Sequence, residues 1–102
     1  MNEDKFKKDF YAVTQFGMLK NGGVSRLAFS REDMAARKYL VRAMEKEGLI
    51  VSMDAVGNIR GKRKGTTDLP PVVMGSHLDT VPCGGHYDGT IGILGGLAVI
   101  RK

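Results

Sequence analysis

The sequence predicts an α/β fold in which helices pack on a small mixed sheet, and three observations point to it. Two early segments repeat apolar residues at helical spacing, the middle of the chain alternates with the period of a strand, and the last segment is apolar and rich in glycine. The resulting order of helix, helix, three strands and helix supplies too few strands for a sheet of ordinary width. We therefore expect residues 1–102 to be one part of a larger domain, without a second domain.

The first helix is predicted over residues 5–19. Apolar or small residues recur there at offsets of four, three and four, with lysines between them: Phe6, Phe10, Val13 and Gly17. The following Asn21-Gly22-Gly23 ends the helix, because paired glycines cost helix propensity and favour a turn.

The second helix is predicted between Ser30 and Gly48. Ser30 is a good N-cap, and Glu32 and Asp33 place negative charge in the first turn, where the helix dipole favours it. Gly48 is typical of the residue just after a helix, where a left-handed backbone is common.

Strands are predicted in the middle of the chain. Residues 49–60 alternate with period two around a turn at 56–59, which indicates two antiparallel strands. After Pro70 and Pro71, the short apolar run Val72–Met74 is typical of a strand buried on both faces. A closing helix is predicted over residues 90–102, where glycines allow close packing against the sheet.

Composition excludes several classes of protein. The 16 Lys+Arg and 11 Asp+Glu residues give a net charge of +5, but the basic run at residues 60–64 contains no aromatic residue, so we expect no nucleic-acid partner. The longest apolar stretch, Ile91–Ile100, is too short to cross a membrane. With a single cysteine, Cys83, and no apolar leader behind the N-terminus, we expect a cytoplasmic protein.

The residues most suited to chemistry follow the predicted strand at 72–74. His77 and Asp79 are two positions apart, so in extended backbone they project to the same side. Asp88 precedes the last helix, and glycines let the backbone return tightly toward His77. A neutral imidazole and a carboxylate are zinc ligands, and a second carboxylate fixes the imidazole tautomer. The alternative is that the His-x-Asp pair is ordinary structure, because so short a motif often occurs by chance.

This stretch also resembles a known family. The segment GSHLDTVP at 75–82, with GG at 84–85 and YDG at 87–89, is similar to the first metal-binding stretch of the N-carbamoyl-L-amino-acid hydrolase and allantoate amidohydrolase branch of the dinuclear zinc-peptidase-like amidohydrolases. GVSRLAFS at 23–30 and DAVGN at 54–58 follow the N-terminal pattern of the same branch in the same order. The resemblance covers residues 20–100.

The resemblance implies the N-terminal part of a zinc-peptidase-like catalytic domain that carries a pair of divalent metal ions, Zn, Mn, Co or Ni. It implies that His77 binds one metal, that Asp88 bridges the pair, and that Asp79 supports His77 without being a ligand. Cys83 and His86 fall in the variable rim of the loop and are not expected to be ligands. The general-base glutamate, a second glutamate and two histidines come from later sequence in the family.

The function that the resemblance implies is the hydrolysis of linear amides, with N-carbamoyl-L-amino acids or related ureido acids as small-molecule substrates. A homodimer is implied for the full-length form. Because hydrolysis needs a base to take a proton from water, we expect the 102-residue chain alone to be inactive. Two alternatives stay open: a non-catalytic fragment that folds or pairs with another chain, and a simple metal-binding module.

Overall fold

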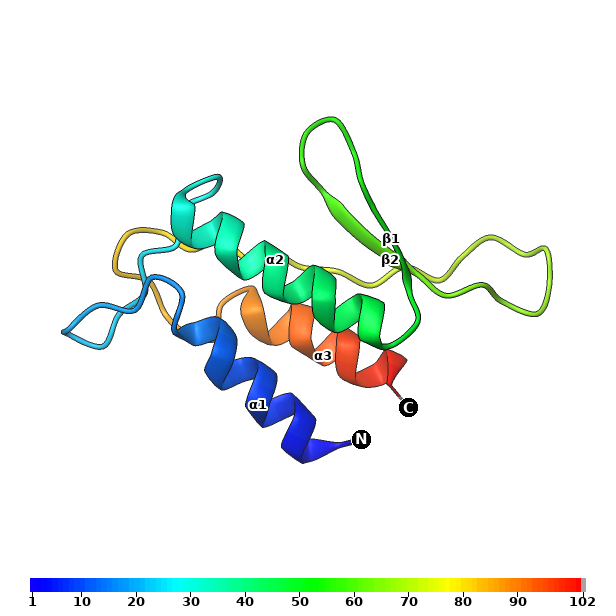
Figure 1. Cartoon of the computed structure of the whole chain (residues 1–102), viewed down its shortest axis with the longest axis horizontal. Helices are drawn as coiled ribbons and strands as arrows, with labels where there is room; N and C mark the ends of the chain where they lie inside the picture. The colour runs from blue at the N-terminus through cyan, green and yellow to red at the C-terminus, as the bar shows by residue number, and fades with distance from the viewer. Residues whose placement is uncertain (102) are drawn as a thin grey trace.

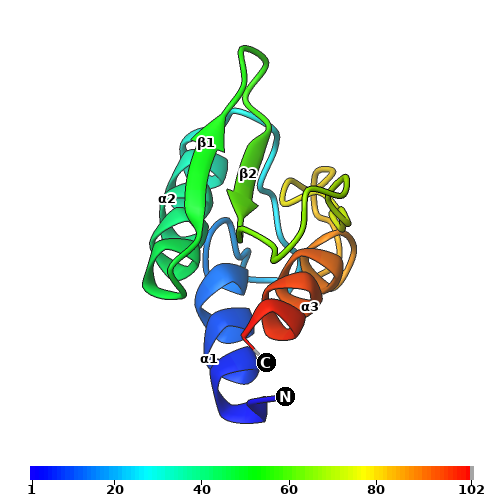
Figure 2. The ribbon, with the colours of Figure 1, turned by 90° about the vertical axis from the view of Figure 1, so that its right-hand side faces the viewer.

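A computed structural model describes residues 1–101 of the chain as three helices and one two-stranded sheet. In chain order the elements are α1 (Glu3–Thr14), α2 (Arg31–Lys46), β1 (Ile50–Met53), β2 (Ile59–Lys62) and α3 (Thr90–Ile100). The three helices lie together, and the β1–β2 hairpin projects beside α2 (Figures 1 and 2).

Helix α1 is shorter than the sequence predicts and begins earlier. Asn2 caps it by accepting a hydrogen bond from the backbone N–H of Lys5 at 3.1 Å. It ends at Thr14 because the backbone N–H groups of Gln15 and Phe16 donate to carbonyl oxygens three residues back rather than four. In addition, the side chain of Arg26 donates a hydrogen bond to the Val13 carbonyl oxygen at 3.0 Å. A contact between distant residues, rather than the apolar pattern, therefore sets this end.

Both predicted ends of α2 are confirmed. The Ser30 hydroxyl accepts a hydrogen bond from the backbone N–H of Asp33 at 3.2 Å. At the other end, Gly48 has a φ of +77°, the left-handed conformation expected just after a helix.

The predicted antiparallel pair of strands is also confirmed. Ile50 pairs with Lys62 and Met53 with Ile59. The carboxylate of Asp54 closes the turn by accepting hydrogen bonds from Val56 N and Asn58 N, at 3.1 and 2.9 Å. The hydrogen bonds from Asn58 are the main reason that the pKa of Asp54 lies below its usual value.

The predicted strand over Val72–Met74 is wrong for this structure. The segment is extended but pairs with no strand among residues 1–101, and Val72 and Val73 are 97% and 84% exposed. A buried strand needs neighbours on both edges and layers on both faces, and the observed sheet consists of β1 and β2 alone. The α/β class holds, but the sheet is antiparallel rather than mixed.

The hydrophobic core lies where the three helices meet the segment after the extended stretch. It is built from Val13, Ala36, Leu40, Ala43, Leu78, Leu94 and Leu97. Leu78 places the neighbouring His77 next to this core, so the candidate site is attached to the packed part of the molecule.

Polar contacts tie the far ends of the helices together. Arg101 pairs with Asp9 of α1 at 2.5 Å and with Glu47 after α2 at 2.9 Å. Tyr39 of α2 donates a hydrogen bond to Asp9 at 2.6 Å. Burial first, then this hydrogen bond and the charge of Asp9, raise the pKa of Tyr39 to about 12. Within residues 1–101, no helix is long and apolar enough to cross a membrane.

Candidate metal centre

The structure brings the three sequence-predicted site residues together. His77 and Asp79 lie in the loop after the extended segment, and Asp88 lies just before α3. The Nε2 atom of His77 is 3.4 Å from Oδ2 of Asp88, although the two residues are eleven positions apart. On the other side of the ring, Nδ1 is 3.4 Å from Oδ1 of Asp79.

A backbone contact fixes the tautomer of His77. Nδ1 is 2.9 Å from the backbone carbonyl oxygen of Asp79, closer than the carboxylate of the same residue. A carbonyl oxygen can only accept, so Nδ1 carries the hydrogen in this bond. In the neutral ring, Nε2 then presents its lone pair toward Asp88. Asp79 thus supports His77 mainly through its backbone rather than through the carboxylate that the sequence suggests.

The facing atoms of His77 and Asp88 suit a shared cation. Two donors bound to one tetrahedral zinc ion at about 2.0–2.1 Å lie roughly 3.3–3.4 Å apart. The 3.4 Å between Nε2 and Oδ2 matches this spacing. Two acceptors that face each other need a donor or a positive group between them, and a cation would supply one. Residues 1–101 contain no group of three or more His, Cys, Asp or Glu side chains arranged to hold a metal ion.

Gly89 permits the approach of the two donors. Its φ is +71°, a conformation that side chains disfavour. A Cβ atom at this position would lie 2.3 Å from the His77 carbonyl oxygen and 2.5 Å from its Nδ1. The backbone before α3 therefore packs directly on the His77 ring, which no larger residue would allow.

The rim of the loop is held by contacts with residues 14–25. The ring nitrogens of His86 contact the Thr14 hydroxyl and the Gly22 carbonyl oxygen, so both are engaged within the protein. Cys83 is exposed, and its Sγ accepts a hydrogen bond from Asn21 at 3.3 Å. These contacts anchor the loop that carries Asp88.

Sequence reasoning gave no site role to two buried polar residues, Arg26 and Thr90. Arg26 is 1% exposed, and its guanidinium donates to the Thr90 hydroxyl at 3.0 Å. The backbone N–H of Thr90 donates to the Asp88 carbonyl oxygen, and the Arg26 carbonyl oxygen accepts from the backbone N–H of Thr80, the residue after Asp79. A basic residue in a mixed segment is normally read as exposed, so the sequence carried no signal of this burial.

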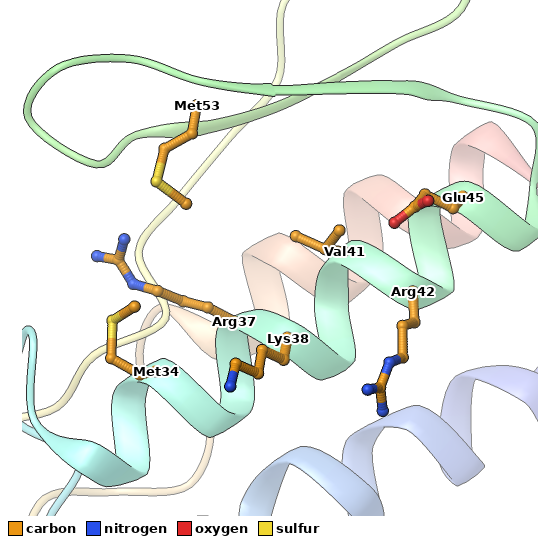
Figure 3. A pocket seen from close by; sticks show the side chains of 7 residues that line it. All are labelled: Met34, Arg37, Lys38, Val41, Arg42, Glu45 and Met53. Carbon is orange, nitrogen blue, oxygen red and sulfur yellow. The ribbon is translucent and has the colours of Figure 1, made fainter.

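A separate open groove of about 310 Å³ lies between α2 and β1 (Figure 3). It combines apolar and charged side chains: Met34, Arg37, Lys38, Val41, Arg42, Glu45 and Met53. His77, Asp79 and Asp88 do not line it, so the candidate metal centre and this groove are distinct features.

Comparison with solved structures defines the class of protein. The hydantoinase/carbamoylase family amidase from Burkholderia ambifaria superposes with a TM-score of 0.92 at 38% identity, over 96% of this chain and 24% of that one. The fold is therefore that of a quarter of a carbamoylase-type amidase, which confirms the predicted fold class. The search of family models gave no match.

Sequence relatives narrow the class further. The N-carbamoyl-L-amino-acid amidohydrolase of Pseudomonas sp. (strain NS671) is 37% identical over 99% of this chain and 25% of its own length. The allantoate amidohydrolase of Bacillus subtilis is 37% identical over 88% of this chain and 22% of its own length. The chain is thus a homologue of the N-carbamoyl-L-amino-acid and allantoate amidohydrolases and spans about a quarter of their length, as the resemblance predicted.

Proposed function

We propose that this chain is the metal-binding segment of an amidohydrolase that cleaves a C–N bond of N-carbamoyl-L-amino acids or related ureido acids. The observation that carries the proposal is the convergence of His77 Nε2 and Asp88 Oδ2 at 3.4 Å. The names of the relatives support the substrate class. The predicted dimer of the longer protein belongs to the same proposal.

Each site residue has a distinct task in this proposal. His77 supplies a neutral nitrogen, because its other nitrogen is held by the Asp79 carbonyl oxygen at 2.9 Å. Asp88 supplies a carboxylate with two oxygens, which suits it to contact two ions. Asp79 keeps the imidazole oriented, and such support raises the basicity of the ligand. When bound, a divalent metal lowers the pKa of water and polarises the substrate carbonyl.

The proposal also requires groups that this chain does not bring to the site. Catalytic zinc usually has three protein ligands, whereas His77 and Asp88 provide two. Within residues 1–101 no further His, Cys, Asp or Glu side chain completes the set. Since the chain spans a quarter of its relatives' length, we propose that the remaining ligands and the general base belong to sequence outside it.

Calorimetric titration with Zn²⁺, Mn²⁺, Co²⁺ and Ni²⁺ tests the metal site. We expect weak binding to the unchanged chain, and an affinity at least about tenfold lower in His77→Ala and in Asp88→Asn, because each change removes one of two donors. Asp68→Asn is the matched control: it removes an exposed carboxylate from the segment after β2, which runs to the right-hand end of the molecule in Figure 1. Equal titrations for His77→Ala and the unchanged chain would remove His77 from the site.

An activity assay tests the reaction. The chain is incubated with divalent metal and an N-carbamoyl-L-amino acid, alone and together with the remaining three quarters of a carbamoylase-type relative. We expect no turnover alone and turnover with the remainder. Turnover by the chain alone would contradict the view that the base lies elsewhere.

A second candidate, a non-catalytic chain that pairs with a partner, is favoured by one observation. Val72 and Val73 are exposed although their sequence is that of a buried strand. The proposed partner is the remainder of the amidase fold, which would add strands beside this segment. Val73→Glu should then abolish association in sedimentation experiments, whereas Val56→Glu, at the exposed hairpin turn, should not. Pairing without turnover would favour this candidate over the enzyme.

A further inference from the structure

Arg26 is a buried cation at the centre of the molecule. It is the largest of the fully buried side chains. Its guanidinium donates hydrogen bonds to four oxygen atoms: Leu78 O at 2.9 Å, Val13 O at 3.0 Å, Phe16 O at 2.8 Å and Thr90 Oγ1 at 3.0 Å. Within residues 1–101 no carboxylate forms an ion pair with it.

The buried guanidinium charge needs hydrogen-bond acceptors or opposite charge around it, since burying an isolated cation costs folding free energy. The carbonyl group of Val13 belongs to the last turn of α1, where the helix dipole is negative, and that of Phe16 follows two residues after the helix ends. Burial lowers the pKa of Arg26, and the charges of Asp33 and Asp79 partly offset this effect. The guanidinium remains charged, because arginine does not deprotonate in proteins. An apolar side chain would fill the space at lower cost but could not make these bonds.

Two of the four hydrogen bonds reach the two sides of the metal centre. Leu78 lies between His77 and Asp79, and Nε of Arg26 holds its carbonyl oxygen. Thr90 is two residues after Asp88, and Nη2 of Arg26 holds its hydroxyl. The guanidinium is planar and rigid, so it fixes the distance between the two backbone segments that it joins.

Backbone contacts reinforce this arrangement. The Arg26 N–H donates to Thr80 Oγ1 at 2.9 Å, and the Thr80 N–H donates to the Arg26 carbonyl oxygen at 2.8 Å. The segment after His77 is therefore aligned with residue 26 before the side chain reaches across to α3.

We propose that Arg26 is a positioning residue that sets the separation of His77 Nε2 and Asp88 Oδ2 by clamping Leu78 O and Thr90 Oγ1. This inference rests on the proposed function, in which His77 and Asp88 bind metal. Arg26 itself touches neither metal nor substrate.

The test compares variants that weaken the clamp with variants that spare it. Arg26→Lys keeps the charge but loses the planar fork, and Thr90→Val removes one acceptor with little change of shape. Thr90→Ser restores the hydroxyl. Tyr39→Phe is the matched control for stability, because it removes a part-buried hydrogen bond to Asp9 and none of the four guanidinium bonds of Arg26. Should Arg26→Lys fail to fold, Thr90→Val carries the test.

Two measurements are made on each folded variant at pH 8. The first is Zn²⁺ affinity by calorimetry. We expect at least about a tenfold loss in Arg26→Lys and Thr90→Val, recovery to within about threefold in Thr90→Ser, and no change in Tyr39→Phe. The second, made without metal, is the tautomer of His77 from nitrogen NMR. We expect the Nδ1–H form in the unchanged chain and a mixture of tautomers in Arg26→Lys.

The outcomes separate the inference from the proposed function. Unchanged Zn²⁺ affinity in both clamp variants, with binding by the unchanged chain, would overturn the role of Arg26 and leave the metal site standing. If the unchanged chain binds no Zn²⁺, the proposed function fails. The His77 tautomer alone then tests whether Arg26 positions His77. If Arg26→Lys shows the same tautomer as the unchanged chain, the positioning role of Arg26 is overturned.

Discussion

Replacing Gly89 by alanine should damage both the stability of the chain and its proposed metal site. At a φ of +71°, an L-residue costs about 1–2 kcal/mol. The added Cβ would also lie 2.3 Å from the His77 carbonyl oxygen and 2.5 Å from Cε1 and Nδ1 of its ring. Relieving such an overlap costs about 1–3 kcal/mol. Together these effects predict a loss of about 2–5 kcal/mol, a large share of the ~5–15 kcal/mol that stabilises a typical domain.

The ring of His77 is the part most able to move away from the new methyl group. Its displacement would break the 2.9 Å hydrogen bond to the Asp79 carbonyl oxygen and separate Nε2 from Asp88. Urea unfolding followed by circular dichroism measures the stability, and calorimetry with Zn²⁺ measures the site. We expect a lower unfolding midpoint and a loss of Zn²⁺ binding.

Gly85→Ala is the matched control in the same loop. No atom lies within 4 Å of the position that its Cβ would occupy, and its φ is not positive. We expect a change of less than about 0.5 kcal/mol, as for ordinary surface substitutions. If Gly89→Ala unfolded at the same urea concentration as Gly85→Ala and bound Zn²⁺ equally well, the close packing of this glycine on His77 would be refuted.

Two further predictions concern stability alone. Because the pKa of Tyr39 is raised from 10.0 to about 12, its contribution to the free energy of unfolding is complete below pH 10 and is lost as the pH rises toward 12. The free energy of unfolding, measured from pH 9 to 11.5, should therefore fall less in Tyr39→Phe than in the unchanged chain. Parallel curves for the two proteins would contradict this assignment. Ser30→Ala removes the cap of α2 and should cost about 1 kcal/mol of stability, or ~4–8 °C in Tm for a chain of this size. Its Zn²⁺ affinity should not change. An unchanged Tm in thermal denaturation would show that the cap contributes nothing.

Local signals predicted those parts of the fold that depend on neighbouring residues. Ser30 and Gly48 mark the ends of α2 correctly, because a cap and a left-handed residue act within one helical turn. The hairpin follows from alternation around a turn that Asp54 closes with its own neighbours. The sequence pattern failed where contacts with residues distant in sequence set the structure. One case is the end of α1, which Arg26 helps to fix. The other is Val72–Met74, which lacks paired strands in residues 1–101.

The candidate site shows the same division. Its residue types and the glycine beside Asp88 could be chosen from the sequence, since His-x-Asp spacing and turn residues are local features. The support of His77 by a backbone carbonyl oxygen could not be chosen, because it depends on how the loop folds over the ring. The contact between Arg26 and Thr90 joins residues 64 positions apart, and no periodicity carries that information.

The sequence by itself therefore determined the helix α2, the hairpin, the donor types at the candidate metal centre and the resemblance to the carbamoylases. Only the tertiary structure decided that Nε2 of His77 faces Asp88 at 3.4 Å, and that a buried guanidinium joins the two segments that carry them. The physical reason is that side-chain chemistry and short-range backbone preferences are properties of nearby residues. The distance between two such side chains depends on the packing of the whole chain.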